Sequence, residues 1–505
     1  MRGTLGTLLD QIEIYSREGA YPFHMPGHKR NVKGAAPFFA QWFERDLTEI
    51  PGTDDLHAPE GILKEAQDRA AVLYGARQSF FLVNGSTAGV LAAISAAVSK
   101  GGTILMQRAS HRSAYHAVLL RDLKVRYLYG RQTECRENGN IGLGVDMEEV
   151  REAVERDPRI EAVFLTSPSY DGFSSDVSGI AAYLHTRNIP LIVDAAHGAH
   201  LGFSEHFPKS ALQCGSDVVV MSVHKTLPAP TQTALLHLGS ERVSAERIQR
   251  FLSVYQTSSP SYLLMAAIDD CVDRVAKWDA SVWQDFYERR KQLSDRLHRL
   301  KQTGIWDCFG RSCVPGLEDA QAEEIPQRDM PEPGKLLVFA QDGKSGVALG
   351  EWLASEGVQC EMALPAYVLL ICTVCDTEEG YEKLAETLEK LDRKPETIYH
   401  GRAVCENSDA NRSEEAEVSV IREDHLHGNT AEDAEMTLAE AAELPAEKIR
   451  LSEAEGHISA GFVSVYPPGQ PLLVPGERIT ERKVKELKEL LQQGAAVQGL
   501  KTGGK

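Results

Sequence analysis

The stretch Val219-Val220-Met221-Ser222-Val223-His224-Lys225-Thr226 predicts a short buried strand that ends in a hydroxyl, an imidazole and an amine. Earlier in the chain, Leu191-Ile192-Val193-Asp194 predicts a second buried strand, which ends in a carboxylate. Short apolar strands of this kind are typical of a mainly parallel sheet that is covered on both faces. In open α/β sheets, ligands bind at the carboxyl ends of the strands, where these polar groups are expected to lie.

Lys225 and Asp194 are the two groups that a pyridoxal phosphate (PLP) enzyme needs. A lysine amine forms a Schiff base with the cofactor aldehyde, and a carboxylate keeps the pyridine nitrogen protonated, so that the ring accepts electrons. The plain alternative is a surface lysine after a strand. A desolvated position at a strand end favours the neutral amine that attacks an aldehyde, so we predict that Lys225 and Asp194 are catalytic.

Bulk composition limits the class of protein. A chain of 505 residues is expected to fold into two to four domains. The formal charge of −19 argues against a nucleic-acid partner. No run approaches the roughly 18 uninterrupted apolar residues of a membrane span, so no membrane partner is expected. The N-terminus does not have the pattern of a secretory signal. The 9 scattered cysteines suggest a reducing, cytoplasmic setting.

The pattern of apolar residues predicts four regions. Residues 1–60 form an N-terminal helix and a loop segment, and residues 61–290 form a large domain in which helices and strands alternate. Residues 291–400 are expected to form a smaller α+β domain. Residues 401–505 combine an acidic linker with a C-terminal α+β segment. In the large domain we expect helices over 62–74 and 85–99 and strands over 79–83, 103–106, 162–166, 191–193 and 218–221.

Two further motifs follow predicted strands. Asn84-Gly85-Ser86-Thr87 lies at the start of a helix, where backbone N–H groups and hydroxyls can bind a phosphate. Ser and Thr are also ordinary helix caps, so this motif is weak by itself. His111 follows the strand at 103–106 and is either a cap or a ring that stacks on the cofactor.

Metal binding is the main alternative for two groups of residues. Asp194, His197 and His200 could contribute metal ligands, but no further ligand cluster is evident and the strand end favours a cofactor. Cys372 and Cys375 lie in a strand-like run whose alternation sends the two thiols to opposite faces, so we expect them in the core. We therefore predict no metal.

These motifs, taken in order, resemble the bacterial ornithine/lysine/arginine decarboxylase family of PLP enzymes. The resemblance covers nearly the whole chain and is strongest to the short members, arginine and lysine decarboxylases without the receiver-like wing domain. It implies an aspartate-aminotransferase-like large domain (PLP fold type I). The motifs that carry it are Phe23-His24-Met25-Pro26-Gly27-His28-Lys29, Asp54-Asp55-Leu56-His57, Asn84-Gly85-Ser86-Thr87, Ser110-His111-Arg112-Ser113, Asp194-Ala195-Ala196-His197-Gly198-Ala199-His200, Ser222-Val223-His224-Lys225, Ser258-Ser259-Pro260-Ser261-Tyr262 and Tyr466-Pro467-Pro468-Gly469.

The resemblance also implies a role for each site residue. Lys225 would form the Schiff base, Asp194 would hold the pyridine nitrogen, and His111 would stack on the ring. Glu477 would select the distal cation of a basic amino acid. Ser258 would reach the phosphate of a neighbouring subunit, which implies a homodimer with its sites at the interface. The remaining cofactor-binding residues would be Ser86, Thr87, Ser222, His224 and His197.

The expected reaction is α-decarboxylation of a basic amino acid, with arginine favoured over lysine or ornithine, as part of polyamine metabolism. His224 or Lys225 would return a proton to Cα. An aminotransferase would use the same Lys225 and Asp194, with Arg402 or Arg478 binding the substrate carboxylate. A lyase or aldolase, or a non-catalytic PLP-binding protein, would also fit the same cofactor.

Overall fold

A computed structural model describes residues 6–17, 25–26, 28–29, 37–50, 52–134, 140–301, 303–312, 330–340, 346–394, 416–422, 436–465 and 470–501. The chain divides into two compact units. The first unit comprises Met1–Val98, Ala162–Phe164 and Val177–Trp283, and the second comprises Ser99–Glu161, Leu165–Asp176 and Gln284–Lys505. Each unit is described by itself.

The largest sheet has seven strands in the order β1-β9-β8-β7-β6-β2-β3. Neighbours β7 and β8 are parallel, as are β2 and β3, whereas β9 runs antiparallel to both β1 and β8. The expected α/β class and mainly parallel sheet are confirmed. The strands are β1 (Gln78–Leu82), β9 (Ala234–Leu238), β8 (Val218–Ser222), β7 (Leu191–Asp194), β6 (Ile160–Thr166), β2 (Thr103–Gln107) and β3 (Lys124–Leu128).

In the first unit, helix α4 (Gly85–Ala97) packs directly on the sheet. A Cβ atom at Gly89 would lie 2.6 Å from Leu82 Cδ1 and 2.9 Å from Val220 Cγ1, so only glycine allows this approach. The other helices of the unit are α1 (Leu8–Arg17), α2 (Pro37–Arg45), α3 (Ile62–Tyr74), α7 (Val177–His185), α8 (Val223–Thr226), α9 (Ala245–Tyr255) and α10 (Tyr262–Lys277).

Helix α1 is attached to the first unit by a buried carboxylate. The Leu8 N–H donates to Asp269 at 2.7 Å, and the Arg69 guanidinium binds the same carboxylate at 2.7 Å. Asp269 therefore caps the N-terminus of α1 while its charge is neutralised by arginine. The predicted N-terminal helix is confirmed from Leu8 onward.

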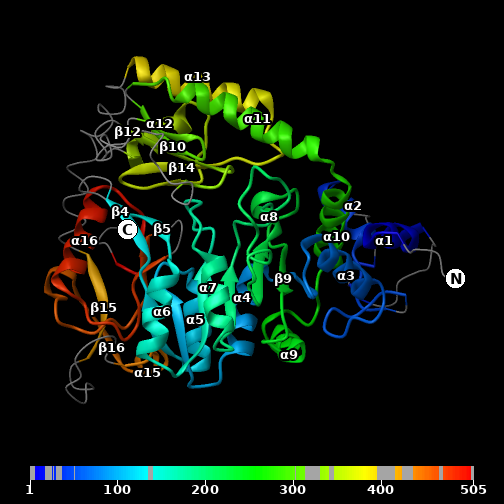
Figure 1. Cartoon of the computed structure of the whole chain (residues 1–505), viewed down its shortest axis with the longest axis horizontal. Coiled ribbons are helices and arrows are strands. Elements are labelled where there is room, and N and C mark those ends of the chain that lie inside the picture. The colour runs from blue at the N-terminus through cyan, green and yellow to red at the C-terminus, as the bar shows by residue number, and fades with distance from the viewer. Residues whose placement is uncertain are drawn as a thin grey trace. The chain divides into compact units, whose positions relative to one another are not determined.

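The second unit contains an antiparallel five-stranded sheet in the order β11-β10-β12-β14-β13. Helices α11 (Ala280–Leu297) and α13 (Glu378–Arg393) lie side by side (Figure 1), joined by Arg296, which pairs with Glu382 at 2.8 Å and also with Glu389. The unit also contains α5 (Arg112–Arg121), β4 (Arg131–Glu134), β5 (Asn140–Gly144), α6 (Met147–Arg156), β10 (Thr303–Asp307), β11 (Gly310–Ser312), β12 (Lys335–Ala340), α12 (Gly346–Ser355), β13 (Met362–Ala363) and β14 (Tyr367–Ile371).

The C-terminal part of the second unit has its own apolar core, which includes Val418, Leu451, Leu473 and Leu487. Much of the predicted acidic linker lies outside the described residues. The elements are β15 (Glu417–Ile421), α15 (Leu438–Glu443), β16 (Ala446–Arg450), a 3-10 helix (Leu451–Glu453), β17 (Val463–Val465), β18 (Pro471–Leu473), α16 (Glu481–Gln492) and β19 (Val497–Gln498).

One prediction about the cysteines is wrong. Cys372 is buried, but Cys375 is exposed, because strand β14 ends at Ile371 and the chain turns before the second thiol. In the described part of the chain, no helix combines the length and apolar character needed to cross a bilayer.

Candidate functional site

Lys225 lies at the carboxyl end of strand β8. The strand ends at Ser222, and the one-turn helix α8 begins at once and carries Lys225 half-buried. Its Nζ lies 3.1 Å from Nε2 of His197, a buried histidine that follows the parallel neighbour β7. The two strand ends therefore bring an amine and an imidazole into direct contact, as their shared direction predicts.

Asp194 ends strand β7 and is almost completely buried, with 3% of its surface exposed. Burial raises the pKa of its carboxyl group, while the nearby charge of Lys225 and the Ala196 N–H act in the opposite direction. The Ala196 N–H donates to Asp194 Oδ1 at 3.0 Å, which fixes the side chain. A buried carboxylate of this kind is suited to hold a protonated pyridine nitrogen.

His224 is held in one orientation by the backbone. Its Nδ1 donates to the Thr233 carbonyl at 2.9 Å, which leaves Nε2 as the ring nitrogen able to accept a proton. Partial burial lowers the pKa of the ring, the Thr233 carbonyl raises it, and the positive charge of Lys225 lowers it further. The net shift is downward, so His224 is neutral near pH 7.

The predicted phosphate-binding residues offer polar groups that are not used in helix capping. Ser222 Oγ is fully buried and has no hydrogen-bond partner among the described residues. Asn84 precedes α4 but makes no side-chain capping bond, and its Oδ1 instead accepts the Thr257 N–H at 3.1 Å. Ser86 is half-buried and Thr87 is exposed in the first turn of this helix. A buried hydroxyl and a helix N-terminus without a side-chain cap suit a phosphate group.

Ser258 is exposed and follows Thr257 directly. The Thr257 contact with Asn84 attaches this segment to the start of α4 within the same chain. Gln256 adds a second attachment, because its Oε1 accepts the Val83 N–H at 2.8 Å. Sequence reasoning found Ser258 but missed these anchors, which join residues far apart in the chain.

His111, in the second unit, is the N-cap of helix α5. Its Nδ1 accepts the Ser113 N–H at 3.2 Å and lies 2.8 Å from Ser113 Oγ. Since the accepting nitrogen carries no hydrogen, the neutral ring has its proton on Nε2. The cap fixes the orientation of the imidazole relative to α5.

Glu477, also in the second unit, is paired within the chain. Its Oε2 accepts from Arg108 at 3.2 Å, and its Oε1 lies 2.5 Å from Lys483 Nζ. Sequence reasoning selected Glu477 but missed both cations, because nothing in the local pattern links Arg108 to residues after position 470.

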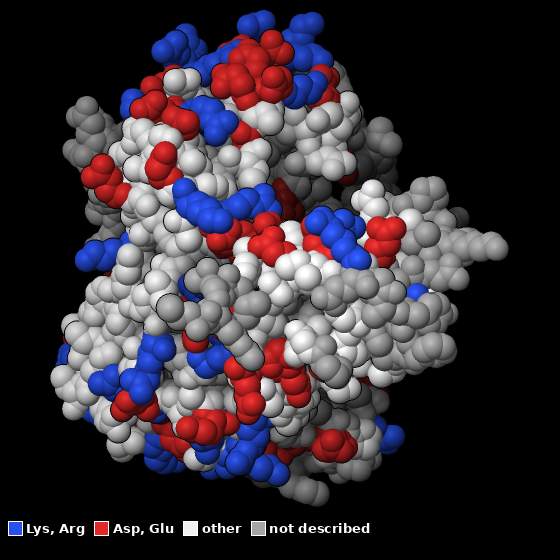
Figure 2. Space-filling view, turned by 90° about the vertical axis from the view of Figure 1, so that its right-hand side faces the viewer, with Lys and Arg blue, Asp and Glu red and all other residues white. Residues whose placement is uncertain are grey.

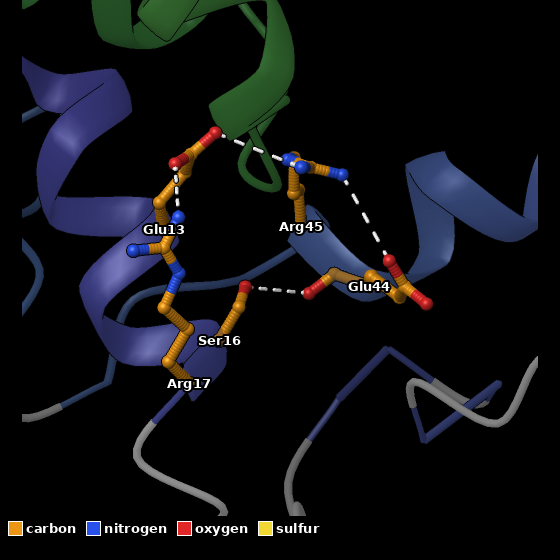
Figure 3. A pocket seen from close by; sticks show the side chains of 5 residues that line it. All are labelled: Glu13, Ser16, Arg17, Glu44 and Arg45. Carbon is orange, nitrogen blue, oxygen red and sulfur yellow. Dashed lines mark hydrogen bonds and ion pairs between the residues drawn. The ribbon is translucent and has the colours of Figure 1, made fainter.

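A separate pocket lies between helices α1 and α2 of the first unit and contains none of the predicted site residues (Figure 3). Its charges are paired with one another: Glu13 binds Arg17 at 3.0 Å and Arg45 at 3.6 Å. Ser16 donates to the Glu44 carbonyl at 2.7 Å. Because these charges already pair with one another, the pocket is poorly suited to bind a charged ligand.

The described residues contain no group of three or more His, Cys, Asp or Glu arranged to hold a metal ion. On the face drawn in Figure 2, the described basic and acidic residues are interspersed. The negative formal charge of −19 is therefore not gathered into one field on this face.

Known proteins match this chain over most of its length. An uncharacterised protein of Bacillus subtilis, YaaO, is 34% identical over 96% of this chain and 94% of its own. An arginine decarboxylase of the same organism is 31% identical over 94% of this chain and 92% of its own.

Solved structures share the fold. The constitutive lysine decarboxylase of Escherichia coli superposes with a TM-score of 0.75 at 19% identity, covering 97% of this chain and 79% of that one. An L-threonine transaldolase of Pseudomonas fluorescens superposes with a TM-score of 0.53 at 16% identity, covering 74% of this chain and 77% of that one. The expected type I fold is confirmed.

Two family descriptions match the chain, and together they span both units. The description "Orn/Lys/Arg decarboxylase, major domain" covers residues 7–380, and "Orn/Lys/Arg decarboxylase, C-terminal domain" covers residues 424–499. The expected family and the expected decarboxylase class are confirmed. The chain belongs to the Orn/Lys/Arg decarboxylase family.

Proposed function

We propose that this protein removes the α-carboxylate of arginine, using PLP held by Lys225, with lysine and ornithine as weaker substrates. The observation that carries the proposal is that Lys225 and Asp194 lie at the ends of two parallel strands. Lys225 contacts His197, and Asp194 is buried near Lys225. The curated relatives with higher identity include arginine decarboxylases at 27–31%, whereas the lysine decarboxylases are at 22–23%. This difference favours arginine.

Different residues of the first unit would bind the cofactor and transfer the proton. Asp194 would hold the pyridine nitrogen in its protonated form, and Ser222, Ser86 and Thr87 would bind the phosphate. When bound, PLP supplies the electron sink that makes loss of CO2 possible. Lys225 or the neutral His224 would carry the proton that returns to Cα.

The contact between His197 and Lys225 suggests a further role. His197 Nε2 lies 3.1 Å from the Lys225 amine and can either accept a hydrogen bond from it or donate one to it. We propose that this bond orients the amine toward the cofactor aldehyde. His111 would cover one face of the ring by stacking.

We propose that the active protein is a homodimer in the cytoplasm and that Ser258 reaches the phosphate of the neighbouring subunit. Ser258 is exposed next to a segment anchored at the start of α4, so its hydroxyl is available to a second copy. The scattered cysteines support a reducing compartment.

The test is to incubate the purified protein with PLP and, separately, with arginine, lysine and ornithine, and to identify amines by mass spectrometry. We expect the decarboxylated amine of arginine to form fastest. Lys225→Ala should abolish it. Asp194→Asn should slow it by roughly 10²-fold or more, because the ring loses the charge that stabilises its protonated nitrogen.

Ser281→Ala, a change in an exposed helix start outside the site, should leave the rate unchanged. If no amine forms from any of the three substrates, the decarboxylase proposal is wrong. If an α-keto acid forms once an acceptor is added, the aminotransferase alternative takes its place.

A further inference from the structure

The segment 256–261 of the first unit joins helices α9 and α10 and carries three exposed hydroxyl side chains at residues 257–259. Side chains from distant parts of the same unit bind both backbone polar groups of Thr257. Its N–H donates to Asn84 Oδ1 at 3.1 Å, and its carbonyl lies 2.8 Å from His57 Nε2. An exposed loop that is already held in one conformation loses less entropy when it binds a ligand.

His57 lies in a motif that the proposed function leaves without a role. Because a carbonyl oxygen can only accept, the neutral ring carries its hydrogen on Nε2 and donates it to Thr257. Its Nδ1 is buried and has no hydrogen-bond partner among the described residues. The polar effect of this side chain is therefore exerted on the 256–261 segment.

The backbone that carries His57 is itself held in place. Asp55 Oδ1 accepts the His57 N–H at 2.8 Å, and Gln249 Nε2, on helix α9, donates to the His57 carbonyl at 2.8 Å. The Asp54 carboxylate accepts two backbone N–H groups at the start of α3, at 2.8 and 3.0 Å. Since the turn is fixed, the imidazole can restrain the segment that it binds.

Both ends of the 256–261 segment are fixed as well. Gln256 Oε1 accepts the Val83 N–H at 2.8 Å, and its Nε2 donates to a carbonyl of β1 at 3.3 Å. At the other end, Ser261 caps α10 by accepting the Leu264 N–H at 3.4 Å. Ser258 therefore lies exposed in the middle of a segment that is attached on both sides.

We propose that His57 is a positioning residue, which holds the 256–261 segment in the conformation from which Ser258 reaches the cofactor phosphate of the neighbouring subunit. The inference rests on the proposed function, which gives that role to Ser258. His57 fixes the Thr257 carbonyl, Asn84 fixes the Thr257 N–H, and Ser258 follows directly in the chain. His57 itself does not touch the cofactor.

The test measures PLP affinity by titration of cofactor absorbance, and thermal melting of the cofactor-free protein, for variants of His57 and Ser258. His57→Ala should weaken PLP binding about fivefold, the size of one lost neutral hydrogen bond. His57→Gln should restore most of the affinity, because an amide N–H can donate to the same carbonyl. In the background of Ser258→Ala, His57→Ala should weaken PLP binding no further, since its effect passes through that hydroxyl.

His185→Ala is the matched control. His185 also uses Nε2 in a contact within the first unit, with Asp217 Oδ2 at 3.1 Å. Asp217 directly precedes strand β8, at the opposite end of that strand from Lys225. The control should therefore lower the melting temperature and leave PLP affinity unchanged.

Mixed dimers separate positioning from damage within one subunit. Lys225→Ala and His57→Ala would be refolded together, and mixed dimers isolated through two different affinity tags. The site with the intact lysine then lies in the His57→Ala subunit but receives Ser258 from the subunit that keeps His57. Titration at the absorbance of the lysine-bound cofactor should show wild-type affinity at this site.

Several outcomes would overturn the inference. These are unchanged PLP affinity in His57→Ala, effects of His57→Ala and Ser258→Ala that add fully, and weak PLP binding in the mixed dimers. A wild type that binds PLP but forms no amine would contradict the proposed decarboxylation alone, because PLP affinity is measured without substrate.

A second variant keeps the inference testable if His57→Ala does not fold. His57→Phe removes the same hydrogen bond but keeps an aromatic ring, and an apolar ring suits a site where Nδ1 is buried without a partner among the described residues. It should weaken PLP binding by the same factor of about five as His57→Ala. Wild-type affinity in His57→Phe would overturn the inference.

Discussion

At the level of single residues, burial is the main cause of the pKa shifts of Asp194 and His224 in the first unit. Asp194 and His224 lie in the candidate site, and burial shifts the pKa of each toward its neutral form. Lys225 opposes this at Asp194 and reinforces it at His224, since a positive charge favours a carboxylate and disfavours an imidazolium. The site therefore combines a carboxyl group beside an amine with an imidazole that stays neutral.

Burial also lowers the pKa of His237, and this shift makes the stability of the protein depend on pH. It is fully buried in β9, its Nδ1 lies 2.7 Å from Ser79 Oγ, and burial lowers its pKa from 6.5 to about 3. Between these values the unfolded chain binds a proton that the folded chain does not, so stability falls as pH drops from 6.5 toward 3 and is unaffected above 6.5.

We expect His237→Gln to flatten the pH dependence of unfolding in this window. The measurement is urea unfolding at pH 7.5 and pH 5 for both proteins. The loss of unfolding free energy on acidification should be smaller in the variant by about 1–2 kcal/mol, because a shift of one pKa unit is worth about 1.4 kcal/mol. An equal loss in both proteins would contradict the assignment.

At the level of elements, the small residues of α4 set how close the helix lies to the sheet. Ala88, Val90, Ala92 and Ala93 are buried on this helix, and Gly89 faces Leu82 and Val220. Because the helix lies this close, its first turn stays beside the ends of the strands, where Ser222 is found. Packing thus sets the position of the residues that we propose bind the phosphate.

Gly89→Ala should destabilise the protein and weaken PLP binding together. Its methyl group would meet Leu82 Cδ1 at 2.6 Å, and such overpacking typically costs about 1–3 kcal/mol. Gly380→Ala is the control: its nearest contact is Thr377 Oγ1 at 3.7 Å, so it should be neutral or slightly stabilising. The measurements are thermal melting and PLP titration of the two variants. Equal stability of Gly89→Ala and Gly380→Ala would refute the packing argument.

At the level of the whole molecule, the second unit contains separate apolar cores. Phe173, Trp306 and Phe339 pack together in one cluster of the second unit, whereas Val418, Leu451 and Leu487 pack in another. A C-terminal part with a separate core can be stable while its polar contacts are changed. Changes to polar contacts around one of these clusters are therefore expected to leave the other core intact.

If the active protein is a homodimer with shared sites, mixing two defective variants should restore activity. Lys225→Ala and Ser258→Ala remove groups that would serve the same site from different subunits. Refolding the two proteins together should produce mixed dimers with one intact site each, so activity should return to about one quarter of the wild-type level when half of the dimers are mixed. The measurement is amine formation before and after mixing.

No recovery on mixing would indicate that Ser258 serves the site of its own subunit. The Thr257 contact with Asn84 makes this the specific alternative. Lys225→Ala mixed with wild type is the control for any other effect of mixing, and its activity should equal that of the wild-type share alone.

The sequence by itself predicted a candidate reaction centre and several of the local elements. Helix 62–74 was predicted with the bounds that α3 has, and Lys225 and Asp194 were placed at strand ends, because apolar runs and their polar ends are local features. The motifs also identified the family, since their order along the chain is itself a sequence property.

Only the tertiary structure decided the antiparallel direction of β9, the anchoring of Thr257 at Asn84, and the pairing of Glu477 with Arg108 and Lys483. Arg108 and Glu477 lie 369 positions apart, and no periodicity connects residues at such a distance. Long-range ion pairs form only after the chain has folded, because burial then makes an unpaired charge costly.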